Sequence, residues 1–88
     1  MKTSEITIQS PAGMHARPAG ELVKLVKSFA PAKVSISNGA KTVSAASILS
    51  ILSLGLKCGS IAVITVEGTD NEQSILDEVC SFIGNIKD

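Results

Sequence analysis

The chain of 88 residues is long enough for one compact domain and too short for two, so we expect a single domain over residues 1–88. Eight Lys and Arg residues balance eight Asp and Glu residues, and this balance argues against a nucleic-acid-binding protein. No apolar run approaches the roughly eighteen residues of a membrane span, and no signal peptide precedes the first polar residues. We therefore expect a cytoplasmic protein without direct membrane insertion, and we expect it to be a monomer.

Apolar residues make up 44% of the chain and aromatic residues only 2%, which predicts an aliphatic core. The two cysteines, Cys58 and Cys80, are too few for a disulfide framework and are expected to be reduced thiols. His15, the single histidine, and these two cysteines lack the spacing of a zinc site. We expect neither a metal nor another cofactor.

Periodicity in the first half of the chain predicts a strand, a helix and a hairpin. Residues 5–9 alternate between polar and apolar side chains, which is typical of a half-buried strand. Over residues 19–29 the apolar side chains recur at the spacing of an amphipathic helix, which Ala30-Pro31 should end. Asn38-Gly39 is a strong hairpin signal, and the returning strand is expected over residues 41–45.

The second half predicts a short helical segment, a strand and a final helix. Residues 47–54 form the helical segment, and Gly55 follows it as a natural C-cap residue. Residues 61–66 are a β-branched run typical of a strand inside a sheet, and Thr69 and Glu72 have the spacing of a capping box. The final helix is expected to bury Ile75, Leu76, Val79, Phe82, Ile83 and Ile86. The order βαββαβα predicts an α+β fold with helices on one face of an antiparallel sheet.

The segment best suited to chemistry surrounds His15. A loop over residues 10–13 precedes it and the helical pattern follows within one turn, so His15 should lie at or beside the N-cap. Pro18 is tolerated in the first turn, where the backbone N–H groups of Ala16 and Arg17 can point at an anion. A phosphoryl group on the imidazole would also meet the Arg17 guanidinium, whose planar fork donates two hydrogen bonds. A lone histidine at a helix start is more often a cap or a solvated surface residue, and spacing alone leaves that alternative open.

A basic stripe should run along the helix away from His15. At about 100° per residue, Arg17, Gly20, Lys24 and Lys27 share one face, opposite the apolar face. This stripe, with a patch free of side chains at Gly20, suits an acidic partner. An ordinary solvated helix face is the alternative interpretation of the two lysines.

The apolar residues of the short helical segment spread over more than half of its circumference. They are Ile48, Leu49, Ile51, Leu52 and Leu54. One packed face of a two-turn helix cannot bury so wide an arc, so some of these side chains should be exposed as a docking patch. A helix sunk between neighbouring elements would explain the same pattern equally well.

Two motifs resemble those of a known family. Gly-Met-His-Ala-Arg-Pro-Ala over residues 13–19 resembles the active-site signature of the HPr family, the phosphocarriers of the bacterial phosphoenolpyruvate-dependent sugar phosphotransferase system. Lys41-Thr42-Val43 and Ser47-Ile48-Leu49, followed by Ser53-Leu54-Gly55, resemble the regulatory-serine signature of the same family. The resemblance runs from the first strand to the final helix, with both motifs in order. The related protein Crh does not match, because it lacks the active-site histidine.

The resemblance implies an open-faced β-sandwich, a four-stranded antiparallel sheet with three helices on one face. It implies that His15 accepts a phosphoryl group from enzyme I and passes it to a histidine on the IIA domain of a sugar permease. The protein would then be a covalent carrier and not a turnover enzyme. Arg17 and the backbone N–H of Ala16 would assist at the site.

The resemblance also assigns a docking surface and a regulatory site. The docking residues would be Lys24, Lys27, Ile48, Leu49 and Leu52, and Gly20 joins them by its place on the same helix face. Ser47, at the expected N-cap of the short helical segment, would be phosphorylated by an HPr kinase/phosphorylase, as happens in many bacteria. A catabolite transcription regulator is a further partner that the resemblance suggests.

The sequence departs from the family at a few positions and leaves other functions open. Ala12 stands where many members carry Asn or Ser, Ala46 replaces a frequent lysine, and one extra residue lies between Phe29 and Lys41. A carrier of the regulatory nitrogen branch would use the same chemistry with different partners. An interaction module that binds a transcription regulator would carry no acid-labile phosphate. An α+β ligand-binding domain fits the composition, but no ligand-cavity motif supports it.

Overall fold

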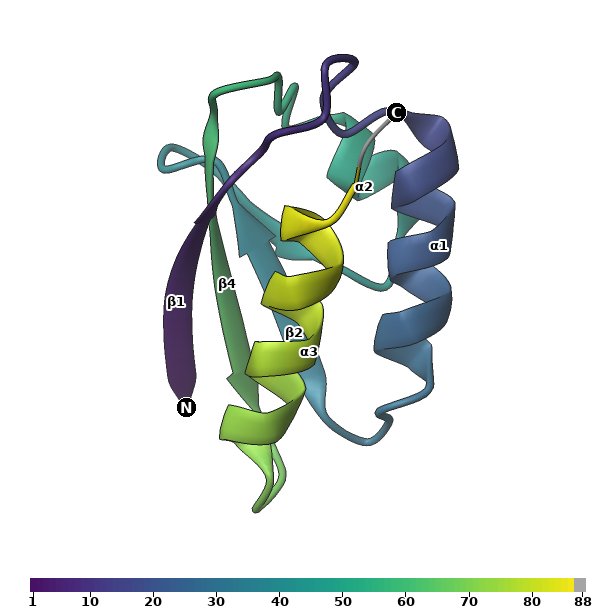
Figure 1. Ribbon diagram of the computed structural model, residues 1–88. Helices are drawn as coiled ribbons and strands as arrows, with labels where there is room; N and C mark the ends of the chain where they lie inside the picture. Colours follow the sequence, from purple (N-terminus) through teal and green to yellow (C-terminus); the bar gives the residue numbers. More distant parts are fainter. Residues whose placement is uncertain (87–88) are drawn as a thin grey trace.

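The computed structural model describes residues 1–86 as a four-stranded sheet with helices on one face (Figure 1). In chain order the elements are β1 (Lys2–Thr7), α1 (Ala16–Lys27), β2 (Lys33–Ser37), β3 (Thr42–Ser44), α2 (Ile48–Leu52), β4 (Ile61–Glu67) and α3 (Glu72–Gly84). The strands lie side by side in the order β1-β4-β2-β3, and every neighbouring pair is antiparallel. The predicted order of elements and the α+β class are confirmed.

The central position of β4 explains its β-branched composition. It pairs with β1 on one side and β2 on the other, so Ile64 lies opposite both Ser4 and Ile36. Alternate side chains of β4, including Ala62, Ile64 and Val66, are buried under the helices. Within residues 1–86 the other face of the sheet carries no helix (Figure 1).

The long helices bury the faces that periodicity predicts, with one exception. The buried residues of α1 include Ala19, Leu22, Val23 and Val26, and those of α3 are Ile75, Leu76, Val79 and Ile83. The prediction that Phe82 is buried is wrong, because it lines a shallow surface groove with Leu25 of α1 and is only half-buried. Ile86 is buried as predicted, although α3 ends before it, at Gly84.

Two strands differ in extent from their predicted ranges. β1 begins at Lys2 and ends at Thr7, earlier at both ends than the predicted range of 5–9. The prediction missed the first residues of the strand because they are all polar and show no alternation with apolar side chains. β3 ends at Ser44, where the serine Oγ accepts the Ala46 N–H at 3.1 Å and turns the chain away from β2. Ala45 is still buried, and its N–H donates to the Val34 carbonyl at 2.9 Å.

The predicted capping box ahead of α3 is wrong. Asn71 is the N-cap residue and makes no side-chain cap hydrogen bond, while the Thr69 hydroxyl is buried and has no hydrogen-bond partner among residues 1–86. The Glu72 carboxylate instead accepts the Gly68 N–H at 3.0 Å and lies 2.7 Å from the Met1 ammonium. The ammonium, aided by the Gly68 and Thr69 N–H groups, holds the pKa of Glu72 below its usual range against the opposite effect of desolvation.

Replacing Glu72 with Gln should destabilise the protein at neutral pH, and the effect should shrink as the pH falls. Because the folded pKa is lowered, the carboxylate stabilises the fold fully above the unfolded pKa of a glutamate, about 4.3, and this contribution is lost as the pH falls through the folded value. Urea unfolding of Glu72→Gln and wild type at pH 7 and at successively lower pH measures the difference. A difference in unfolding free energy that grows on acidification would contradict the prediction.

Candidate functional site

His15 is the N-cap residue of α1, as predicted. Its backbone is extended, with φ −94° and ψ −175°, and its carbonyl accepts the Ala19 N–H at 3.0 Å. The side chain makes no cap hydrogen bond, so the imidazole does not serve as the helix cap. The residue as a whole is half-buried.

The first turn of α1 is suited to an anion. Ala16 and Arg17 are exposed, Pro18 is buried and has no N–H group, and Ala19 already donates to His15. The backbone donors of this helix end therefore come from Ala16 and Arg17. The first turn contains no acidic residue, so no carboxylate in that turn offsets the positive end of the helix dipole.

The basic stripe is present, and Gly20 lies within it as a half-buried residue. Lys24 and Lys27 are exposed and form no ion pair with any other residue from 1 to 86. Ile48 Cδ1 lies 3.8 Å from the position that a Cβ on Gly20 would occupy. An added Cβ would thus be in ordinary van der Waals contact with Ile48, and Gly20 lies where α1 meets α2.

The wide apolar arc of α2 is divided between core and surface. Ile51 is fully buried and Leu54, just after the helix, is buried, whereas Leu49 is 80% exposed and Ile48 41% exposed. Leu52 is half-buried and packs against the core. The expectation that part of the arc is exposed is confirmed, and the alternative of a sunken helix holds for the buried part.

Polar contacts fix both ends of α2. The sequence predicted the N-terminal contact, made by Ser47, but not the contacts at the C-terminal end. Ser47 is the N-cap residue, and its Oγ accepts the Ser50 N–H at 3.4 Å. At the other end, Asn38 Nδ2 donates to the Leu54 carbonyl at 3.0 Å and Lys41 Nζ donates to Ser53 Oγ at 3.1 Å. The β2–β3 hairpin thus holds α2 in place. The Asn38-Gly39 motif predicted the hairpin, but it gave no indication of these contacts with α2.

The two cysteines are far apart in sequence and differ in their surroundings. Cys58 is exposed and Cys80 is half-buried, and both are free thiols. Burial raises the pKa of the Cys80 thiol, which makes it a poor nucleophile. Within residues 1–86 no cluster of His, Cys, Asp and Glu could hold a metal ion, and no helix there is long and apolar enough to cross a membrane.

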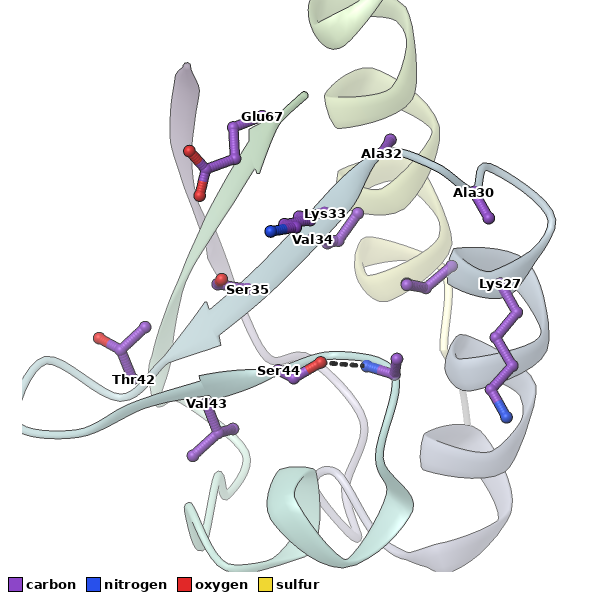
Figure 2. Close-up of a pocket in the computed structure, with 12 residues that line it drawn as sticks. Lys27, Ala30, Ala32, Lys33, Val34, Ser35, Thr42, Val43, Ser44 and Glu67 are labelled. Atoms are coloured by element: carbon purple, nitrogen blue, oxygen red, sulfur yellow. Dashed lines mark hydrogen bonds between the residues drawn. The ribbon is translucent and has the colours of Figure 1, made fainter. Parts of the chain in front are cut away.

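A hollow of about 650 Å³ lies away from His15, between the end of α1 and the β2–β3 hairpin (Figure 2). Val26, Val34 and Val43 contribute to its apolar lining, and Lys27 and Lys33 also line it. Neither His15 nor any residue of its loop takes part. This hollow is therefore separate from the His15 site.

Comparison with known proteins agrees with this geometry. The model of the family described as "PTS HPr component phosphorylation site" matches residues 2–85. Phosphocarrier protein HPr of Lysinibacillus sphaericus is 40% identical over 74 residues, which cover 84% of this chain and 83% of the relative. The corresponding protein of Buchnera aphidicola subsp. Acyrthosiphon pisum is 37% identical over 75 residues, covering 85% of this chain and 87% of the relative. A crystal structure of phosphocarrier protein HPr from Bacillus anthracis aligns with a TM-score of 0.85 at 32% identity, covering 93% of this chain and 95% of that chain.

Fold and similarity together define a class, the small phosphocarriers of the phosphotransferase system. Within this class the chain belongs to the HPr family. The open-faced sandwich implied by the sequence motifs is confirmed by the arrangement of the sheet and helices and by the HPr neighbours.

Proposed function

We propose that the protein, as a single domain over residues 1–88, carries a phosphoryl group on His15 between enzyme I and the IIA domains of sugar permeases. The observation that carries this proposal is the half-buried imidazole at the N-cap of α1, which is not used for capping. A ring nitrogen lone pair bonds to phosphorus as the bond between phosphorus and the donor side chain breaks. The reverse exchange delivers the group to the next protein, so the carrier is regenerated and no cofactor is needed.

The surroundings of His15 support both halves of this exchange. A phosphoryl group beside the helix end meets the backbone N–H of Ala16 and the positive end of the α1 dipole. Arg17, exposed in the same turn, can donate two hydrogen bonds to phosphate oxygens and remains charged at any relevant pH. These donors favour the negative charge that spreads over the transferring group, which is the main catalytic requirement of phosphoryl transfer.

Phosphoenolpyruvate with enzyme I should add one acid-labile phosphoryl group to the wild-type protein and none to His15→Ala. The reason is that the chain contains no other histidine. Intact-mass measurement before and after mild acid treatment checks the number and lability of the groups. Equal phosphorylation of the two proteins would place the acceptor elsewhere, and no phosphorylation of wild type would favour a pure interaction module.

We propose that partners dock on α1 and α2 beside His15. The surface would consist of Gly20, Lys24, Lys27, Ile48, Leu49 and Leu52. Leu49 supports this proposal most strongly, because a leucine with 80% of its surface exposed contributes little to the core. The two lysines provide a positive field for an acidic partner, which raises the rate of encounter.

Leu49→Lys should weaken docking and leave the fold intact. An exposed substitution alters the unfolding free energy by roughly 0.5 kcal/mol or less, whereas loss of an apolar docking contact of about 1.4 kcal/mol raises the KM for enzyme I about tenfold. Ile51→Lys is the matched control, since Ile51 is fully buried two residues away and a lysine there should disrupt folding. Denaturant unfolding and transfer kinetics separate the two effects, and a Leu49→Lys variant with wild-type KM would exclude Leu49 from the surface.

Ser47 is proposed as a second, regulatory phosphorylation site, modified by an HPr kinase/phosphorylase. The serine directly precedes Ile48 and Leu49, so a phosphate there would place about two negative charges beside the apolar docking residues. A partner that buries Leu49 would have to desolvate that dianion, which opposes binding. The phosphorylated form could in turn bind a catabolite transcription regulator.

Ser47→Asp should slow enzyme I-dependent transfer, whereas Ser47→Ala should transfer at the wild-type rate. Aspartate retains the N-cap acceptor and so preserves α2, but alanine removes it at a cost of about 0.5–2 kcal/mol. Transfer rate, circular dichroism and denaturant unfolding for both variants distinguish charge from capping. If Ser47→Asp folds and transfers normally, Ser47 is a cap without an inhibitory role.

We further propose that the protein acts as a monomer in the cytoplasm. A carrier of the regulatory nitrogen branch would use His15 in the same way. Phosphorylation by the enzyme I of each branch, tested side by side, distinguishes these two uses.

A further inference from the structure

We propose that the turn over residues 56–60, here called the supporting turn, positions His15 for phosphoryl transfer without touching the phosphoryl group. This inference rests on the proposed role of His15 as acceptor. The positioning is achieved through backbone contacts with the loop over residues 8–14, which joins β1 to α1.

The end of this loop lies directly on the carbonyl of Leu56. Met14, which is buried, donates its N–H to the Leu56 carbonyl at 2.9 Å. Gly13 has a φ of +72°, and a Cβ added to it would stand 2.5 Å from the same carbonyl oxygen. His15 then donates its own N–H to the Gly13 carbonyl at 3.1 Å. The backbone of Gly13 and Met14 is therefore packed directly against the supporting turn, with no room for a side chain at Gly13.

The beginning of the loop is attached to the other end of the same turn. Gly59 N–H donates to the Ile8 carbonyl and Ile8 N–H donates to the Ser60 carbonyl, each at 2.8 Å. Ile8 is buried, so this attachment is also part of the core. Both ends of the loop that precedes His15 are thus fixed to one five-residue segment.

Ser60 closes the supporting turn. Its Oγ accepts the Lys57 N–H at 3.1 Å, and its own N–H donates to the Lys57 carbonyl at 2.9 Å. Loss of the hydroxyl leaves the second bond and both bonds to Ile8 in place. The Lys57 N–H, however, belongs to the same peptide group as the Leu56 carbonyl that accepts from Met14. Loss of the hydroxyl therefore loosens the peptide plane that holds the end of the loop, while the attachment at Ile8 stays.

The functional consequence follows from how strongly transfer depends on orientation. A displacement of about 1 Å in a reacting group can reduce a rate on the order of a hundredfold. His15 must present the same ring geometry to a donor and to an acceptor, and its ring is attached to a backbone that the loop orients. None of the residues proposed for docking belongs to the supporting turn, so a change in the turn should alter the transfer step and not partner affinity.

The test compares Ser60→Ala, Ser60→Thr and Cys58→Ala in enzyme I-dependent phosphorylation. Ser60→Ala should lower kcat roughly tenfold with KM within about twofold of wild type, because positioning is changed and docking is not. Ser60→Thr, which keeps the hydroxyl, should restore kcat. Cys58→Ala is the matched control in the same turn, since its Sγ makes only a 3.9 Å contact with the Gln9 carbonyl, and it should behave as wild type.

Two further readouts separate positioning from general destabilisation. In the unphosphorylated protein, Ser60→Ala should shift the NMR signals of Met14 and His15 and leave those of α3 unchanged. Denaturant unfolding should show that the variant is folded under assay conditions. A Ser60→Ala variant with wild-type kcat, or with a raised KM and unchanged kcat, overturns the positioning role alone. A wild-type protein that accepts no phosphoryl group overturns the proposed function and this role with it.

Discussion

The close backbone contact between Gly13 and Leu56 determines where α1 can begin. The Leu56 carbonyl accepts the Met14 N–H and leaves no room for a side chain at Gly13. Because His15 follows at the N-cap, this contact constrains the backbone from which the imidazole extends. Position 13 requires glycine for two reasons: its φ is positive, and an added Cβ would clash with the Leu56 carbonyl.

The exposed surface next to His15 depends on equally specific support. α2 has five residues, Ile48–Leu52, and a helix of that length is not stable in isolation. Burial of Ile51 and the hydrogen bonds from Asn38 and Lys41 hold it, so that Leu49 can remain exposed. Buried contacts of neighbouring residues therefore hold this short helix, while the Leu49 side chain lies at the surface.

Much of the architecture could be predicted because it rests on local patterns. Apolar spacing identified the buried faces of α1 and α3, and the β-branched run identified β4 as an inner strand. The capping box failed for the opposite reason: the Glu72 carboxylate bonds Gly68 and the Met1 ammonium, and the latter lies far away in sequence. The prediction that Phe82 is buried was wrong because its exposure depends on how closely α1 and α3 pack at the surface groove beside Leu25.

The sequence by itself determined the order of elements, the family motifs and the place of His15 at a helix start. These features depend on residues within a few positions of one another, whose propensities act through the local backbone. Only the tertiary structure decided that Ile48 lies beside Gly20, that Leu49 is exposed beside buried Ile51, and that residues 56–60 contact the loop before His15. Each of these depends on which distant segments meet in the folded chain, and a periodic pattern contains no information about that choice.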